Sequence, residues 1–219
     1  MIARPTGQAD GPYGAAFLPR LRLTFRPAEH PITEPVAKLG GDPVWLAEPA
    51  WPLDSRTGEP LVFVGQFPIP GDELRLAYLF VEEEDMIMGG LGPEDGDAVV
   101  LVQPGGRVPH FAVTGPAGTR GRTLWRWSPD YREVPVEGHL DLTPAPPGRD
   151  GHELGTYLGG TAYLSHGRPG VDAPWEFLLQ LGDCSGAGED PYFLNFGDGH
   201  GYVFLSPDHL EGRFYWEAP

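Results

Sequence analysis

The chain has 219 residues, a formal net charge of −16 and a pI near 4.6. A surface this acidic argues against direct nucleic-acid binding, which needs a basic face that displaces counterions from phosphate groups. The single cysteine, Cys184, excludes an internal disulfide and fits a reducing compartment. No stretch approaches the roughly 18 apolar residues of a membrane-spanning helix, so we expect a cytoplasmic protein with no membrane partner.

The composition favours a folded chain that is rich in strands. Apolar residues make up 40% of the sequence and are spread along its length, while Gly 32 and Pro 26 supply many turns. A chain of this length can bury a sizeable core, and all-β folds of this size often form one domain. We predict a single globular α+β domain that is predominantly β.

The N-terminal part is expected to hold a loose arm and one strand. Residues 1–16 are rich in glycine, proline and alanine and form the arm. In Arg20–Arg26, apolar and polar residues alternate with period two, which predicts a half-buried strand. Leu21, Leu23 and Phe25 then face inward and the arginines face outward.

The next two strands are apolar on both faces. Pro60 opens the run Leu61–Phe67, and Leu74–Val81 follows; short apolar runs of this kind are typical of strands buried on both sides. Residues 82–97 carry seven acids and no base, so we expect a solvated loop there. Further short strands are expected at Ala98–Gln103, Phe111–Thr114, Thr123–Trp127, Arg132–Val136, His139–Leu142 and Tyr202–Leu205.

A short helix is expected after the last of these strands. Ser206 is a typical helix N-cap, and Pro207 suits the first helical position. Gly212 is then expected to close the helix.

The chain carries the same three motifs twice, which indicates two similar units packed together. They are a Leu-Gly-Gly turn, a Pro-x-x-Phe-x-x-Gln strand and a strand that begins with tyrosine. The first copies stand at Leu39–Gly41, Pro60–Gln66 and Tyr78–Val81, and the second copies at Leu158–Gly160, Pro174–Gln180 and Tyr202–Leu205. We predict that residues 38–81 and 157–205 superpose around an approximate two-fold axis.

The repeat suggests how a single domain over residues 1–219 is organised. The parts are an N-terminal arm and strand at 1–29, a first unit at 30–97, a β-rich middle segment at 98–147 and a second unit at 148–219.

These motifs also carry a family resemblance. The patterns Lys38-Leu39-Gly40-Gly41-x-Pro43, Trp51-Pro52, Pro60-Leu61-x-Phe63-x-x-Gln66, Leu178-Leu179-Gln180-Leu181 and Gly197-Asp198-Gly199-His200-Gly201-Tyr202-x-Phe204 resemble the YwqG-like family of bacterial proteins of unknown function. The resemblance covers about residues 30–216 and implies a mixed, β-rich fold with an internal duplication. It brings no established activity or catalytic residue, although some members are suspected immunity proteins. One departure is that Thr161-Ala162, and not Asp-Pro, follows the second Gly-Gly pair.

Lys38, Gln66 and Gln180 are the candidate ligand-binding residues. Lys38 is the only lysine and precedes the first Gly-Gly turn, while the two glutamines occupy matched positions in the repeat. An amide left unpaired in an apolar strand costs about 1–3 kcal/mol. Each glutamine therefore either ties its own Gly-Gly loop to the strand or helps line a cleft between the repeats.

We expect the chain to be a protein-interaction module, with toxin immunity as one form of that role. Its charge suits a basic protein partner. The alternative function is binding of a small ligand in a cleft between the two repeats. The expected partner contacts are the acids Glu82, Glu83, Glu84, Asp85, Glu94, Asp95 and Asp97.

The sequence suggests no catalytic residue, metal ligand or cofactor. It has no phosphate-binding glycine loop and no zinc pattern. Gly182–Gly186 has the outline of a nucleophile elbow around Cys184, but the helix that an elbow requires does not follow. A third functional alternative, a cation-dependent hydrolase, would use the acids near Asp198 together with His200.

Two sets of side chains that share one face of a strand, the arginines of 20–26 and a tryptophan pair, have structural explanations as well as functional ones. Arg20, Arg22 and Arg26 are expected on a solvated strand face balanced by the acids of 82–97. Trp125 and Trp127 share one face of a strand and are expected in the core, with a stacking platform as the alternative.

Overall fold

A computed structural model of the chain describes residues 18–82, 92–146, 155–162, 164, 171, 174–182, 194 and 199–217. Within these ranges the chain forms strands, turns and loops. The predicted predominance of β-structure is confirmed, whereas the helical component of the predicted α+β class is not found among the described residues. The strands are β1 (Leu21–Pro27), β2 (Lys38–Gly40), β3 (Pro52–Leu53), β4 (Val62–Ile69), β5 (Arg75–Val81), β6 (Ala98–Gln103), β7 (Val113–Thr114), β8 (Trp125–Trp127), β9 (Glu133–Pro135), β10 (Glu137–Pro144), β11 (Tyr157–Leu158), β12 (Glu176–Gly182), β13 (His200–Leu205) and β14 (Gly212–Glu217).

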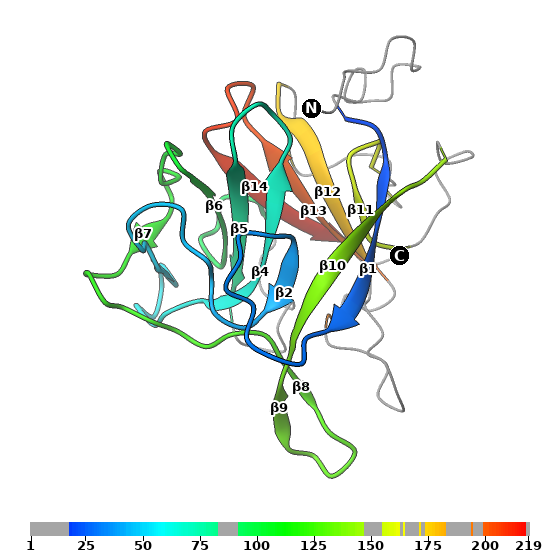
Figure 1. The fold of residues 1–219 in the computed structure, drawn as a ribbon. Coiled ribbons are helices and arrows are strands. Elements are labelled where there is room, and N and C mark those ends of the chain that lie inside the picture. The colour runs from blue at the N-terminus through cyan, green and yellow to red at the C-terminus, as the bar shows by residue number, and fades with distance from the viewer. Residues whose placement is uncertain are drawn as a thin grey trace.

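Ten of these strands form one antiparallel sheet, in the order β14-β13-β12-β11-β1-β10-β2-β4-β5-β6 (Figure 1). In the middle of the sheet β1 pairs with β10 along its whole length, with Leu21 opposite Pro144 and Pro27 opposite Gly138. Two small sheets, β3–β7 and β8–β9, lie outside it. No helix in the described ranges is long and apolar enough to cross a membrane.

The two outer strands of the sheet come together, so the sheet is nearly closed on itself. β6 contacts β14, and a Cβ built on Gly212 would lie 2.3 Å from Cγ1 of Val100. The loop after β6 is bonded to the β13–β14 turn, because the backbone N–H of Arg107 donates to the carbonyl oxygen of Leu210 at 2.7 Å.

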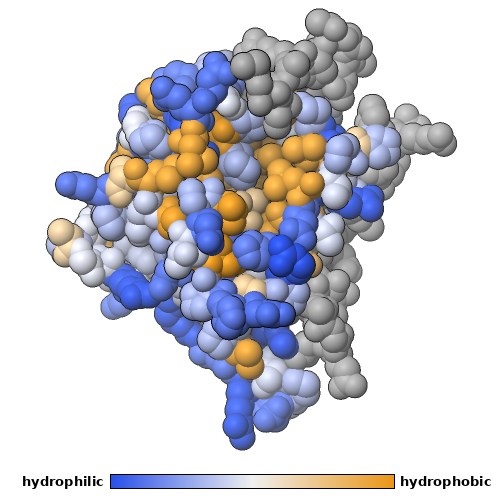
Figure 2. Space-filling view, viewed as in Figure 1, coloured by the Kyte–Doolittle hydropathy of each residue, from blue (hydrophilic) through white to orange (hydrophobic). Residues whose placement is uncertain are grey.

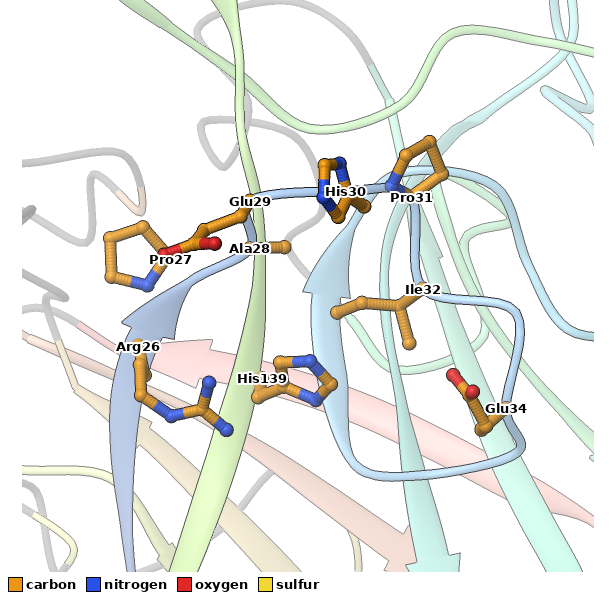
Figure 3. A pocket seen from close by; sticks show the side chains of 9 residues that line it. All are labelled: Arg26, Pro27, Ala28, Glu29, His30, Pro31, Ile32, Glu34 and His139. Atoms are coloured by element: carbon orange, nitrogen blue, oxygen red, sulfur yellow. The ribbon is translucent and has the colours of Figure 1, made fainter.

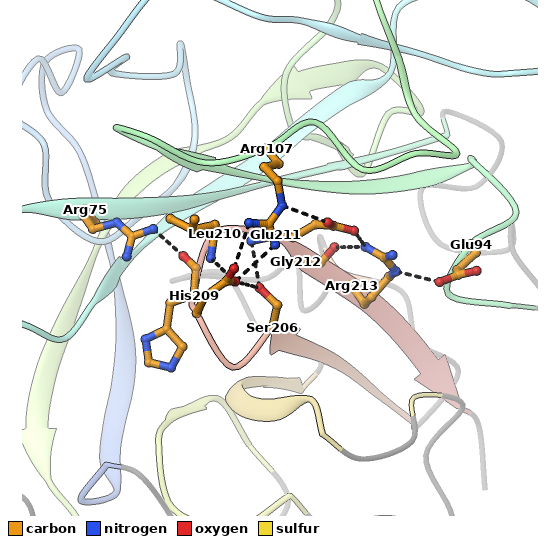
Figure 4. A network of polar contacts seen from close by, with 10 residues as sticks. Arg75, Glu94, Arg107, Ser206, His209, Leu210, Glu211, Gly212 and Arg213 are labelled. Carbon is orange, nitrogen blue, oxygen red and sulfur yellow. Dashed lines mark hydrogen bonds and ion pairs between the residues drawn. The ribbon is translucent and has the colours of Figure 1, made fainter.

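Charged side chains reinforce this closure (Figure 4). The guanidinium of Arg107 donates to both carboxylate oxygens of Asp208, at 2.8 and 3.2 Å. Arg75 on β5 donates to the carbonyl oxygen of His209, and Nε of Arg213 on β14 lies 3.1 Å from Oε1 of Glu94. Elements at opposite ends of the strand order are thus held by ion pairs and hydrogen bonds.

Apolar side chains cover both faces of the sheet toward each end of its strand order, at β4–β6 and at β12–β13. The inner face encloses one large core, which includes Leu39, Phe67, Leu79, Leu158, Leu181 and Val203. A second cluster covers the outer face of β4, β5 and β6 with Trp51, Phe63, Tyr78 and Phe80, and a third covers β12 and β13 with Phe177, Tyr202 and Phe204. The prediction that Leu61–Phe67 is buried on both faces is confirmed.

The predicted strands correspond to β1, β4, β5, β6 and β13, with shifts of one or two residues at most of their ends. The segment Phe111–Thr114 is shorter than predicted, since only Val113–Thr114 pairs. Ala112 donates its N–H to the carbonyl oxygen of Pro109 in a turn, which ends the ladder there.

The predicted helix after Ser206 is wrong, because this segment is the turn that joins β13 to β14. The N–H of His209 donates to the carbonyl oxygen of Ser206, and the N–H of Ser206 donates to that of Glu211. His209 has φ 53°, in the left-handed region, which is incompatible with a helix. Ser206 Oγ bonds Asp208 and accepts from the N–H of Glu211, so the capping residues serve a hairpin.

We expect Asp208→Asn to lower stability at pH 7. The hydrogen bonds from Arg107 and Ser206 hold the pKa of Asp208 below its ordinary value, so its ionised form stabilises the fold above about pH 3.9 and this contribution is lost as the pH falls. Urea unfolding at pH 7 and at pH 3 measures the difference between wild type and variant, which should shrink at the lower pH. Asp72→Asn, at an exposed turn position, is the matched control; an equal loss at both pH values would contradict the expectation.

Candidate functional site

Lys38 forms a buried ion pair at the junction of β2 and β10. Its side chain is 0% exposed, and Nζ donates to Oε1 of Glu137 at 2.8 Å and to the carbonyl oxygen of Ile32 at 3.3 Å. The same Oε1 accepts the N–H of Ile32 at 2.9 Å. A buried charge is tolerated when it is paired and hydrogen-bonded. The pair therefore fixes the loop before β2 against two strands.

Gln66 is fully buried and bonds the loops on both sides of β2. It lies opposite Lys38 in the β2–β4 pairing. Its Nε2 donates to the carbonyl oxygen of Val36 at 2.9 Å, and its Oε1 accepts the N–H of Val44 at 2.9 Å. The geometry supports the structural role, in which the amide ties the Gly-Gly loop to the strand.

Gln180 makes the corresponding bond near the other end of the sheet. Its side chain is 2% exposed, and Nε2 donates to the carbonyl oxygen of Gly155 at 3.1 Å, in the segment that leads into β11. The structure brings Lys38 and Gln66 together as cross-strand neighbours, while Gln180 lies on β12, on the far side of β1 and β10 in the strand order.

Two further buried polar side chains hold the loop that follows the first Gly-Gly turn. The hydroxyl of Tyr78 donates to the carbonyl oxygen of Val44 at 2.7 Å, and burial raises the pKa of Tyr78 to about 12. Gln103 accepts the N–H groups of Leu46 and Ala47 and donates to the carbonyl oxygen of Glu48. Gln103 was not singled out from the sequence, although it is one of only four glutamines.

The acids proposed to contact a partner differ in their surroundings. Glu83, Glu84 and Asp85 lie outside the described residues. Glu82 accepts a hydrogen bond from Arg56 at 2.6 Å, and Glu94 pairs with Arg213. These two carboxylates are therefore engaged within the chain.

Asp95 and Asp97 come next in this loop. Asp95 is exposed, and its carbonyl oxygen accepts the hydroxyl of Ser55. Asp97 is 6% exposed, and burial raises the pKa of its carboxyl group. Among the described residues its Oδ1 has no hydrogen-bond partner. A buried carboxylate of this kind contributes little to a surface.

A cavity of about 420 Å³ lies beside the Lys38–Glu137 pair (Figure 3). The end of β1, the following loop and β10 supply its walls. The lining residues are Arg26, Pro27, Ala28, Glu29, His30, Pro31, Ile32, Glu34 and His139. Ile32 links this cavity to the ion pair, but the three residues predicted to bind a ligand do not line it.

The arginine stripe of β1 has partners on the neighbouring strands. Arg26 donates to both carboxylate oxygens of Asp141, at 2.8 and 3.1 Å. The guanidinium of Arg20 lies 3.7 Å from the ring centroid of Tyr157, and Arg22 donates to the hydroxyl of that tyrosine at 3.3 Å. The partners of the three arginines thus lie on β10 and β11, whereas we expected from the sequence that the acids of 82–97 would balance their charge.

The β8–β9 hairpin projects from the sheet and carries exposed aromatic rings (Figure 1). Trp127 is 53% exposed and meets Trp125 edge-on at 4.9 Å, so the expectation of a core position is wrong for Trp127. Tyr131 in the turn is 87% exposed and has φ 57°. A non-glycine residue in the left-handed region costs free energy that the turn hydrogen bonds of Ser128 offset.

The remaining sequence candidates give no site within the described ranges. Cys184 and Asp198 lie outside those ranges, and His200 is buried in β13. Among the residues that the structure describes, no group of three His, Cys, Asp or Glu side chains is arranged to hold a metal ion. Comparisons of the chain with family models, curated proteins and solved structures give no significant match.

We expect Glu137→Gln to destabilise the fold by about 3 kcal/mol, because it leaves the ammonium of Lys38 buried without a counter-charge. Lys38→Met should cost less, since the side chain of Glu137 is 21% exposed and can reach water. Urea unfolding at pH 7 measures both changes. Glu133→Gln breaks the exposed pair with Arg122 and should cost less than about 1 kcal/mol; an equal cost for Glu137→Gln would contradict the assignment.

The buried carboxyl of Asp97 predicts the opposite pH dependence to that of Asp208. Because its pKa in the folded chain is raised, its ionised form destabilises the fold at neutral pH. Asp97→Asn should therefore raise stability at pH 7. The gain should vanish when the pH falls below about 3.9, where the carboxyl group of Asp97 is protonated in the folded and in the unfolded chain. Thermal unfolding between pH 3 and pH 8 tests this, and a gain that persists at pH 3 would refute it.

Proposed function

We propose that the chain is a cytoplasmic protein-interaction module that anchors its partner on the β8–β9 hairpin. The observation that carries the proposal is the exposure of Trp127 and Tyr131, at 53% and 87%, on an element that stands away from the sheet. Tryptophan and tyrosine are enriched among the residues that contribute most to protein interfaces. Their rings bring large contact area at small conformational cost.

The distribution of hydropathy supports an interaction surface. On the face shown in Figure 2, hydrophobic side chains lie in groups near the middle, and hydrophilic side chains lie between and around them. Protein interfaces combine an apolar centre with a polar rim in this way.

The net charge supports a basic partner. A chain with a formal charge of −16 attracts positively charged proteins over distance and accelerates their association. Glu82 and Glu94 are paired with arginines within the chain, so in this proposal the net charge of the whole chain supplies the long-range field and the hairpin supplies the close contacts.

We also propose that the chain belongs to the YwqG-like family and consists of two copies of one unit related by an approximate two-fold axis. The strand order supports this, because β14-β13-β12-β11-β1 from one end matches β6-β5-β4-β2-β10 from the other. The registers agree as well: Gln66 lies opposite Tyr78 and Gln180 opposite Tyr202, with an irregularity in the ladder before each glutamine.

The glycine turns give further support for the duplication. A Cβ on Gly40 would lie 1.7 Å from the carbonyl oxygen of Val136, and one on Gly159 would lie 2.5 Å from that of Pro19. Both glycines have positive φ, at 64° and 70°. A side chain is therefore excluded at both matched glycines, because it would clash with a backbone carbonyl and because φ is positive.

The form of protein binding that we propose is neutralisation of a basic toxin, because some members of the YwqG-like family are suspected to be immunity proteins.

The test is a binding measurement with two hairpin variants. The tagged chain would be used to retain proteins from an extract of the native host, and the retained protein would be purified and titrated. Trp127→Ser and Tyr131→Ser should each weaken its binding about 30-fold, which corresponds to about 2 kcal/mol for an interface anchor. Val113→Ser is the matched control, because Val113 is 52% exposed on β7, outside the hairpin.

Salt dependence separates the two parts of the proposal. Binding to a basic partner should weaken as ionic strength rises, whereas the effect of the hairpin variants should persist at high salt. A partner that binds both hairpin variants as tightly as wild type would defeat the assignment of the hairpin, and the absence of any retained protein would defeat the proposed function.

A further inference from the structure

The cavity beside β1 and β10 has the size and the lining of a small-molecule site. Its volume of about 420 Å³ lies within the roughly 300–1,000 Å³ of typical ligand pockets. Pro27, Ala28, Pro31 and Ile32 supply apolar wall, and charged or ionisable side chains stand around them (Figure 3). No residue of β8 or β9 lines this cavity, so the site does not depend on protein binding at the hairpin.

The cavity is formed before any ligand arrives. Glu137 and Lys38 hold the backbone N–H and carbonyl of Ile32, and the N–H of Ala28 donates to the carbonyl oxygen of Glu137 at 3.0 Å. Pro27 and Pro31 restrict the loop further, because proline fixes φ. A wall ordered in advance reduces the entropy that a ligand loses on binding.

One end of the cavity presents hydrogen-bond donors. Arg26 and His139 are cross-strand partners, and in Figure 3 the guanidinium of Arg26 extends toward β10 while the ring of His139 lies between Arg26 and Ile32. Asp141 engages Nε and Nη2 of Arg26, but a guanidinium has five N–H donors, so those on Nη1 lie outside that pair. A carboxylate suits this end, since arginine binds carboxylates with charge-assisted hydrogen bonds.

The other end presents an acid. The carboxylate of Glu34 lies on the far side of Ile32 from Arg26, with Ile32 between them (Figure 3). Glu29 also lines the cavity. The two glutamates disfavour a plain anion, while the Nη1 donors of Arg26 need an acceptor that a plain cation lacks. The lining is complementary to a molecule that carries both charges.

We propose that this cavity binds a small zwitterion, in which a carboxylate meets Arg26 and His139, an ammonium meets Glu34 and a short methylene stem lies on Ile32. The chemical class is that of free amino acids and ω-amino acids.

The probes are glycine, 4-aminobutyrate and 6-aminohexanoate, which carry both charges at three separations, with hexanoate and hexylamine as single-charge references. Titration would be followed by NMR chemical shifts of the full-length chain, including the imidazole signals. At least one amino acid should bind about tenfold more tightly than hexanoate and than hexylamine. Equal binding of hexylamine would assign the cavity to cations and overturn the proposal, as would the absence of binding by all three amino acids.

Substitutions at the two ends should act selectively. Glu34→Gln should weaken the best amino acid about tenfold and leave hexanoate unchanged. Arg26→Gln combined with Asp141→Asn should weaken the amino acid similarly and leave hexylamine unchanged, and the double change avoids leaving Asp141 unpaired. Glu59→Gln, and Arg132→Gln combined with Asp130→Asn, change exposed positions outside the cavity and are the charge-matched controls. Equal losses in the control variants would refute the assignment. The hairpin variants should bind the amino acid normally, so this outcome is independent of protein binding.

Discussion

The near-closure of the ten-stranded sheet is the constraint on which the rest of the structure depends. The edge strands of an open sheet expose unpaired backbone groups that invite association with other chains. Here β6 and β14 meet, and the contacts between Arg107, Leu210 and Asp208 hold them together. Closure encloses the inner apolar side chains as one core, and the loops must then cover the apolar outer faces at both ends of the order.

Buried polar side chains fix those covering loops in place. Gln66, Tyr78 and Gln103 each bond backbone groups of the segment between β2 and β3, and Trp45 of that segment stacks on Tyr78 at 5.0 Å. An apolar loop alone would slide on an apolar sheet, whereas a hydrogen-bonded amide defines one position. The same logic applies to the Lys38–Glu137 pair, which shapes the cavity wall while Lys38 itself stays out of reach of solvent.

Local sequence patterns predict the strands well because burial on one or both faces leaves a period in the chain. The alternation in Arg20–Arg26 and the apolar run Leu61–Phe67 correspond directly to β1 and β4. The error at Ser206 arises because Ser-Pro-Asp satisfies a turn as well as a helix start. The cavity was not predictable in this way, since Arg26 and His139, like Lys38 and Glu137, are brought together only by long-range pairing. Trp127 shows the same limit. The sequence indicates that Trp125 and Trp127 lie on one face of a strand, but it does not indicate whether other parts of the chain cover that face.

Under the proposed duplication, the second glycine of each Gly-Gly turn marks a place where the two halves differ. A Cβ on Gly41 would meet the carboxylate of Glu137, whereas one on Gly160 would meet the side chain of Arg20. An anion with a buried lysine thus occupies one half, and a cation stacked on Tyr157 occupies the other. The atoms beside the turn are a carboxylate at Gly41 and the methylene stem of an arginine at Gly160. Matched glycine turns thus pack against an ion pair in one half and an arginine–tyrosine contact in the other, so the common scaffold leaves the chemistry beside the turn open to change.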